Sequence, residues 1–303
     1  MSERPGTTDR MPAYAWRSVE LGPATQIALG QGPLRFHECG QGRPIIFVHG
    51  WLANANLWRK VVPRLAGRWR CIAPDLPLGA HLAPMHADFD GTPDGIARLI
   101  NEFLDALGID AATLVGNDSG GAYSQIATAA RPARIERLIL NACETPYDSF
   151  PPAQFKALQD AARTPDTLAA LLAPLRDPTV RHSPAAFGRL IKHPIDSAAS
   201  DSYALPILEM EGVCHDASRV FASASQADVA AAGRRLISGF GGAVHFIWPT
   251  EDVFFSLENV QRYARELQRA TVDVVNDAFA FTPEDQPARF AELLGAALAS
   301  GAP

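Results

Sequence analysis

Short runs of β-branched and aromatic residues recur along this chain at intervals long enough to hold a helix. One of them, residues 44–48, reads Pro-Ile-Ile-Phe-Val and is followed by a His-Gly pair. A continuous apolar run of this length is typical of a strand buried on both faces of a parallel sheet. Further runs cover residues 71–75, 112–116, 135–140, 243–248 and 271–275, and residues 25–29 and 34–38 resemble a leading antiparallel pair. The sequence therefore predicts a mostly parallel sheet of about eight strands.

Helical segments fill the intervals between these runs. Thr92 and Pro93 supply an N-cap and a first-turn proline, and Gly108 supplies a stop. Between them, apolar residues recur at helical spacing at Ile96, Leu99, Ile100, Phe103, Leu104 and Leu107. Strands that alternate with such helices predict a doubly wound α/β fold. With 303 residues, of which 47% are hydrophobic, the chain is long enough to bury a large core.

The strand rhythm stops between residues 145 and 236 and resumes at residue 243. The intervening segment consists of alanine-rich helical pieces divided by prolines. Because the sheet is still incomplete where this segment begins, we interpret it as a helical cap (lid) on the core rather than a separate binding domain. The predicted core domain comprises residues 1–144 and 237–303, and the predicted cap comprises residues 145–236.

Charge and composition exclude several classes of partner. Lys and Arg total 27 against 33 Asp and Glu, a net charge of −6, so there is no basic field to attract nucleic acid. No stretch approaches the roughly 18–20 apolar residues of a membrane span, so no membrane partner is expected. No HExxH motif or thiolate pair is present, and we expect neither a metal nor a cofactor.

The spacing of the cysteines and the first residues of the sequence indicate the cellular compartment of the protein. The four cysteines are scattered and lack the spacing of a disulfide framework, which favours a reducing compartment. The start of the sequence lacks an apolar signal segment, and about the first dozen residues are expected to form a frayed leader. We therefore predict a cytoplasmic protein.

The most specific motif is Gly-Asn-Asp-Ser-Gly-Gly at residues 116–121, which directly follows a predicted strand and opens a helix. A strand, a tight glycine-flanked turn and a helix form the context of a nucleophile elbow, G-x-Nu-x-G. The central residue is Asp118. A carboxylate there can attack the saturated carbon of an alkyl halide or an epoxide to form an alkyl-enzyme ester. Asp118 is thus the predicted nucleophile, and the alternative is a glycine-rich turn with an N-capping Asp.

With these motifs the chain resembles the α/β-hydrolase superfamily, and within it the aspartate-nucleophile branch of haloalkane dehalogenases, fluoroacetate dehalogenases and epoxide hydrolases. The turn at residues 49–51, His-Gly-Trp, is similar to the family's oxyanion-hole motif. The resemblance implies that the backbone N–H groups of Trp51 and Ser119 stabilise the oxyanion. It also puts Asp252 at the position of the triad acid, where a helix-terminal turn acid is the alternative.

The histidine base of the family has no counterpart at its usual position. The resemblance puts that position at Ala280, and Phe279 replaces the glycine before it. Alanine can neither accept a proton nor orient a water molecule. Natural divergence and an engineered replacement both remain open, and the two adjacent departures favour divergence. His81, just beyond a predicted strand end, is the candidate for a substitute base or a substrate contact, and a surface histidine is the alternative.

Fewer residues bear on substrate recognition. The resemblance implies that Trp51 supplies one donor to a departing halide, whereas Ser119 stands where relatives carry Trp or Arg. Tyr147 and Tyr203 are candidates for the paired cap tyrosines that epoxide hydrolases place over the oxirane oxygen. The residues predicted to line the pocket are His49, Asn141, Glu144, Tyr147, Tyr203, Trp248, Phe254, Phe255, Phe279, Ala280 and Phe281.

The sequence thus predicts an enzyme that attacks a small apolar organic substrate at carbon through Asp118. A haloalkane dehalogenase-like hydrolase is the first expectation, and an epoxide hydrolase-like enzyme is the second. Because residue 280 is alanine, a hydrolase-fold protein without hydrolytic turnover, such as a lyase, a cyclase or a ligand-binding protein, is the third. The oligomeric state is left open, a homodimer included.

Overall fold

The computed structural model of the protein describes residues 12–300. The frayed leader expected from the sequence therefore lies, apart from Pro12, outside the described residues. A single sheet has the strand order β1-β2-β4-β3-β5-β6-β7-β8, with β2 antiparallel to β1 and β4 and all other pairs parallel. The strands are β1 (Ala24–Leu29), β2 (Gly32–Cys39), β3 (Pro44–Val48), β4 (Arg70–Pro74), β5 (Ala112–Asn117), β6 (Ile135–Asn141), β7 (Ala243–Pro249) and β8 (Ala270–Val275).

The predicted fold class and all eight predicted strands are confirmed, each strand to within about two residues at either end. The central strands β3 and β5 are buried along almost their whole length, which agrees with their continuous apolar sequence. The predicted amphipathic helix is α2 (Pro93–Ala106), and the Thr92 side chain accepts a hydrogen bond from the Gly95 N–H as its cap.

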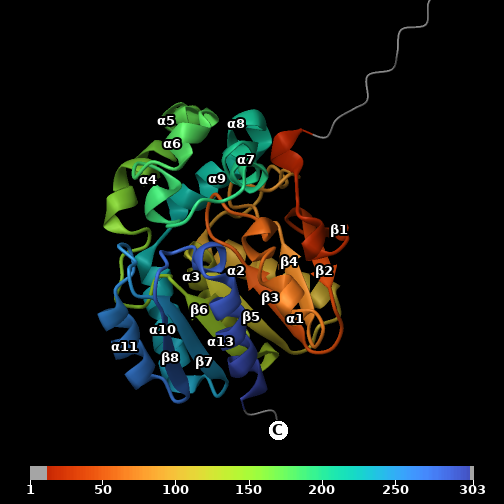
Figure 1. Ribbon diagram of the computed structural model, residues 1–303, viewed down its shortest axis with the longest axis vertical. Helices are drawn as coiled ribbons and strands as arrows, with labels where there is room; N and C mark the ends of the chain where they lie inside the picture. Colours follow the sequence, from red (N-terminus) through yellow and green to blue (C-terminus); the bar gives the residue numbers. More distant parts are fainter. Residues whose placement is uncertain (1–11, 301–303) are drawn as a thin grey trace, which may run out of the picture.

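Helices cover both faces of the sheet (Figure 1). On one face α2 packs beside α3 (Ser119–Ala130), and on the other α1 (Val62–Leu65) packs beside α13 (Pro287–Ala299). Helix α11 (Leu257–Glu266) packs against β7 and β8, and the short α12 (Thr282–Asp285) precedes α13. None of the helices within residues 12–300 combines the length and the apolar character needed to cross a bilayer.

Between β6 and β7 the chain is helical, as the sequence predicts, and most of this segment lies above the sheet at the ends of its parallel strands (Figure 1). Its helices are α4 (Lys156–Ala161), α5 (Pro165–Leu172), α6 (Pro178–Arg181), α7 (Ser197–Ala204), α8 (Pro206–Glu209), α9 (Glu211–Ser223) and α10 (Gln226–Gly239). Helix α10 packs on α3 beside the sheet, so it continues the core layer. The boundary expected at residue 236 lies within this helix and stays a prediction.

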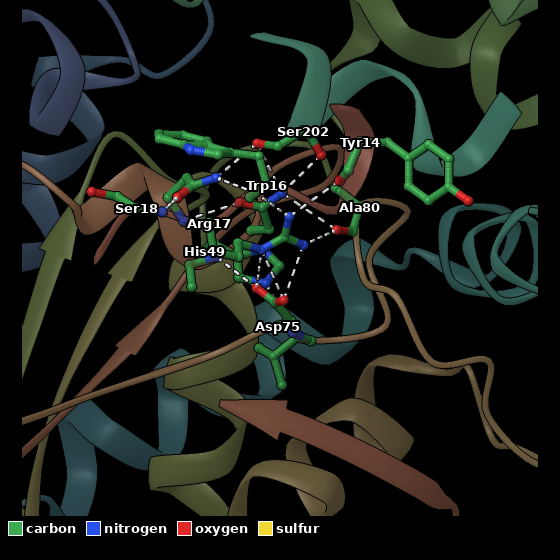
Figure 2. Close-up of polar contacts among 12 residues, drawn as sticks. Tyr14, Trp16, Arg17, Ser18, His49, Asp75, Ala80 and Ser202 are labelled. Carbon is green, nitrogen blue, oxygen red and sulfur yellow. Dashed lines mark hydrogen bonds and ion pairs between the residues drawn. The ribbon is translucent and has the colours of Figure 1, made fainter. Parts of the chain in front are cut away.

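A buried ion pair fastens the segment before β1 to the loop after β4 (Figure 2). The Arg17 Nε donates to both carboxylate oxygens of Asp75, at 3.2 and 3.0 Å, and one terminal nitrogen of Arg17 donates to the Ala80 carbonyl at 2.8 Å. Asp75 also accepts a hydrogen bond from the Ala55 N–H at 2.9 Å. The cluster lies next to His49, so it supports the turn that follows β3.

Candidate active site

The turn between β5 and α3 has the backbone of a nucleophile elbow. Asp118 adopts φ 54°, ψ −142°, an uncommon conformation for a residue with a side chain. Glycine is needed beside it: a Cβ on Gly120 would lie 2.4 Å from the carbonyl oxygens of Val48 and His49. A Cβ on Gly121 would lie 2.4 Å from the Cβ atom of Cys143. The neighbouring strands thus approach this turn too closely for larger residues.

The backbone N–H groups of Ser119 and Trp51 lie close enough to the Asp118 carboxylate to lower its pKa. The Trp51 N–H also lies 2.9 Å from the Ser119 hydroxyl oxygen. Burial raises the pKa of Asp118 to about 7, although the two N–H groups lower it, and the negative charge of Asp252 adds to the rise. The two N–H groups therefore lie where they can stabilise negative charge on the carboxyl of Asp118, and their role toward an oxyanion stays a prediction.

Asp118 opens onto a cavity of about 530 Å³ between the sheet and the helices above it. Its wall is largely apolar, and its charged members are Asp118, Glu144 and Arg189. The aromatic and aliphatic lining residues include Trp51, Leu52, Phe150, Phe155, Leu158, Leu171, Leu172, Leu175, Val180, Phe187, Leu190, Phe221 and Phe254. A cavity of this volume and character suits a small, mainly apolar organic molecule.

Glu144 follows the end of β6 and forms part of the cavity wall. Its side chain is buried, and its Oε2 has no hydrogen-bond partner within the described part of the chain. Burial raises the pKa of Glu144 well above its usual value, and the negative charge of Asp118 contributes to the rise. The cavity thus holds a second carboxyl group that repels charge on the first.

Asp252 follows β7, at the strand end predicted for the acid, but it is not part of the cavity wall. Its Oδ1 accepts hydrogen bonds from the N–H groups of Phe254, at 2.6 Å, and Phe255, at 3.2 Å. Its Oδ2 is buried with no partner among residues 12–300. Burial raises the pKa of Asp252 to about 6. The Oδ1 atom of Asp252 therefore stabilises the turn that contains Phe254 and Phe255, and its Oδ2 atom has no hydrogen-bond partner among the described residues.

Ala280 is fully buried and also lies outside the cavity wall. The side-chain amide of Asn117 donates to its carbonyl oxygen at 2.7 Å and to the Asn141 side-chain oxygen at 2.7 Å. Asn141 in turn donates to Thr282 Oγ1 at 2.9 Å. These bonds tie the segment after β8 to the ends of β5 and β6 without a titratable side chain.

None of the eight histidines, all within the described residues, belongs to the cavity wall. His81, the predicted substitute base, instead places its Nε2 3.1 Å from Asp216 Oδ2 on α9. The structure therefore does not bring His81 to Asp118, because the acidic partner on α9 holds its ring elsewhere. His49 accepts a hydrogen bond from the Leu76 N–H at 2.9 Å, and burial lowers its pKa to about 4. His49 supports the turn as a neutral ring.

The two tyrosines expected over the cavity lie outside its wall. Tyr203 is fully buried and donates to Glu284 Oε1 at 2.7 Å, in a cluster with Arg59. Tyr147 donates to Glu266 on α11 and lies under the guanidinium of Arg262. The structure does not place the two tyrosines at the cavity, because carboxylates outside it accept hydrogen bonds from both hydroxyls.

Of the other predicted pocket residues, Glu144 and Phe254 line the cavity, whereas His49, Asn141, Trp248, Phe255, Phe279, Ala280 and Phe281 do not. Sequence reasoning missed most of the wall that the helices above the sheet provide. Phe221 packs on Trp51 with ring centroids 4.3 Å apart, and Arg189 lies 5.1 Å from the Phe254 ring centroid. No motif marks these residues, and only the position of their helices brings them to the site.

The chain matches the family model described as alpha/beta hydrolase fold over residues 43–211, more than half of its length. It belongs to this family. Among curated relatives it is similar to haloalkane dehalogenase 2 of Mycobacterium tuberculosis, 33% identical over 141 residues, which cover 43% of this chain and 49% of that protein. It is also similar to 2-hydroxy-6-oxo-2,4-heptadienoate hydrolase of Pseudomonas putida, 39% identical over 127 residues (41% and 45% of the two chains). Each match spans about half the length of the relative.

Solved structures share the fold over nearly the whole chain. Haloalkane dehalogenase DbeA from Bradyrhizobium elkani matches with a TM-score of 0.76 and 18% identity, covering 91% of this chain and 97% of the other. The epoxide hydrolase CorEH matches with a TM-score of 0.74 and 19% identity, covering 90% and 96%. At such identities these likenesses establish the fold alone.

Proposed function

We propose that this protein is a hydrolase that attacks a small apolar substrate at a saturated carbon through the Asp118 carboxylate, forming an alkyl-enzyme ester. The observation that carries the proposal is the position of Asp118: a strained elbow presents its carboxyl group to an apolar cavity, with the backbone N–H groups of Ser119 and Trp51 beside it. A carboxylate in such a site is a suitable nucleophile for carbon that bears a leaving group.

The first reaction proposed is hydrolytic dehalogenation of a haloalkane. Trp51 lines the cavity beside Asp118, and its indole Nε1 has no hydrogen-bond partner among the described residues. An N–H donor without a partner next to the nucleophile can stabilise a departing halide. The relatives named as haloalkane dehalogenases support the same reaction class.

Epoxide opening is the second candidate, and Glu144 favours it. A carboxyl whose pKa is raised well above its usual value favours its protonated form, which can donate a proton to the oxirane oxygen. The cavity would thereby supply an acid in place of the two tyrosines, which lie outside it. A soluble epoxide hydrolase of Corynebacterium is among the relatives, 35% identical over 92 residues.

Product analysis tests the proposal. The protein is incubated with n-butyl bromide and with styrene oxide, and release of bromide, butanol and diol is followed over time. We expect product from at least one substrate and none from Asp118→Asn, whose neutral amide is a poor nucleophile. Product formation by Asp118→Asn at the wild-type rate would contradict the proposal. The third expectation, a hydrolase-fold protein without hydrolytic turnover, predicts no product and no ester from wild type or from Asp118→Asn.

A further inference from the structure

The cavity wall contains one proton-transfer group besides the nucleophile. Its charged residues are Asp118, Glu144 and Arg189, and an arginine does not give up its proton near neutral pH. The eight histidines all lie outside the wall, and His81 and His49 have partners of their own. A water molecule that attacks an ester on Asp118 must therefore find its base at Glu144 or bind without one.

The backbone of Glu144 is held in place, and one of its two carboxyl oxygens has no hydrogen-bond partner among the described residues. Its carbonyl oxygen accepts a hydrogen bond from Gln125 Nε2 at 2.7 Å, and Gln125 lies on α3, the helix that Asp118 opens. Its Oε2, by contrast, is buried and has no partner within residues 12–300. A buried carboxylate oxygen without a donor is costly for stability alone, which points to a chemical role.

We propose that Glu144 is the general acid and base of this site and takes the place of the absent histidine. This inference rests on the proposed function, because it assigns Glu144 a role in breaking the ester on Asp118. With a haloalkane, Asp118 displaces the halide and its carbonyl carbon becomes part of the ester. Glu144 then takes a proton from water while the hydroxide oxygen bonds to that carbon.

Hydrolysis of the Asp118 ester needs no reactant other than water. The bond between the carbonyl carbon and the alkyl oxygen breaks, and the alkoxide takes the proton of the new Asp118 carboxylic acid. The alcohol leaves, Asp118 is again a carboxylate, and Glu144 again holds a proton. For a haloalkane, Glu144 first releases its proton to solvent, so that each turnover yields alcohol, halide and one proton. For an epoxide, Glu144 gives that first proton to the oxirane oxygen and the product is a diol.

The charge on Asp118 prepares Glu144 for this sequence. While Asp118 is a free carboxylate, burial and then the negative charge of Asp118 raise the pKa of Glu144 and favour its protonated form. Esterification removes the Asp118 charge, so Glu144 then ionises more readily and can act as the base. The other titratable groups that interact with Glu144 are Asp148, Asp252, Tyr123 and Cys143.

The test compares the lifetime of the ester in wild type and in Glu144→Gln. Each protein is mixed with n-butyl bromide, excess reagent is removed, and the intact mass is followed over time. We expect Glu144→Gln to form the butyl adduct and to lose it at least about 100-fold more slowly than wild type. The rate of loss should rise with pH in wild type and stay flat in Glu144→Gln, which a structural role would not produce. Glu144→Asp, which keeps a shorter carboxylate, should recover part of the rate.

Glu136→Gln is the matched control, since Glu136 is an exposed carboxylate at the opposite end of the same strand, β6. It should lose the adduct at the wild-type rate. Equal lifetimes in Glu144→Gln and wild type would overturn the role of Glu144 and leave the nucleophile in place. Absence of any adduct and any product in all proteins would overturn the proposed function and this inference together. If Glu144→Gln fails to fold, loss of the adduct from Glu144→Asp at the full wild-type rate would overturn the role of Glu144, because the shorter side chain moves the carboxylate away from the ester.

Discussion

Gly50 touches the carboxylate of Asp118: a Cβ built on Gly50 would lie 2.1 Å from Asp118 Oδ2. The turn after β3 therefore fixes the position of the Asp118 carboxylate, the proposed nucleophile. We expect Gly50→Ala to displace the carboxylate and to lower the rate of alkylation by n-butyl bromide roughly 100-fold. Gly67→Ala, where a Cβ would meet nothing within 4 Å, is the control and should alkylate normally. Equal rates in the two variants would show that this contact does not position Asp118.

Alkylation should depend on the ionisation of Asp118. Burial raises the pKa of Asp118 to about 7, and only the ionised carboxylate attacks carbon. The rate of adduct formation should therefore rise about tenfold per pH unit below pH 7 and level off above it. Mass spectrometry of timed samples between pH 5 and 9 measures this profile. A rate that is already constant from pH 5 would mean that Asp118 ionises as an ordinary aspartate.

The same raised pKa has an effect on stability. The folded protein binds the Asp118 proton more tightly than the unfolded chain, so unfolding releases that proton between about pH 4 and pH 7. The contribution of protonated Asp118 to the free energy of unfolding is full below the unfolded pKa and falls as the pH rises through about 7. We expect this fall to be smaller in Asp118→Asn. Urea unfolding at several pH values tests it, and parallel pH profiles for the two proteins would contradict it.

The buried ion pair of Arg17 and Asp75 should contribute much more to the free energy of unfolding than an exposed ion pair does. Both side chains are buried, so Arg17→Met leaves the Asp75 charge without its partner (Figure 2). We expect a loss of about 3–5 kcal/mol in the free energy of unfolding. The control is Arg98→Met, which breaks an exposed pair with Asp90 and should cost about 0–1 kcal/mol. Chemical denaturation measures both, and similar losses would argue against this difference.

Restoring a histidine at residue 280 should not restore a base by itself. Ala280 is fully buried and outside the cavity wall, so a larger ring must displace its neighbours. We expect Ala280→His to cost about 1–3 kcal/mol and to leave ester breakdown no faster. Ala296→His, at an exposed position of α13, should leave stability within about 0.5 kcal/mol. Faster ester breakdown in Ala280→His would show that position 280 still reaches the site.

The sheet and the elbow were predictable because their signals are local. Runs such as residues 44–48 combine length, β-branched residues and a turn signal, and the glycines around Asp118 specify a tight turn wherever the chain lies. The resemblance to the α/β-hydrolase family implied that Trp51 and Ser119 lie beside Asp118, and the Trp51 N–H lies 2.9 Å from the Ser119 hydroxyl oxygen.

The cavity wall was not predictable, because helix packing decides it. Tyr203 and Phe187 are both aromatic residues between β6 and β7, yet only Phe187 lines the cavity. His81 follows a strand end as Glu144 does, but Asp216 on α9 holds the His81 ring. The sequence does put a carboxylate three residues after the end of β6, and only the contacts show that its oxygen lacks a partner.

The covalent role of Asp118 is tested most directly by the fate of water oxygen. Wild-type protein turns over n-butyl bromide in ¹⁸O-labelled water, and the proteolytic peptide that contains Asp118 is then weighed and sequenced by mass spectrometry. If water attacks the carbonyl carbon of an Asp118 ester, ¹⁸O accumulates in the Asp118 carboxylate over successive turnovers. Product that carries the ¹⁸O while Asp118 stays unlabelled would show direct attack by water and would contradict the account.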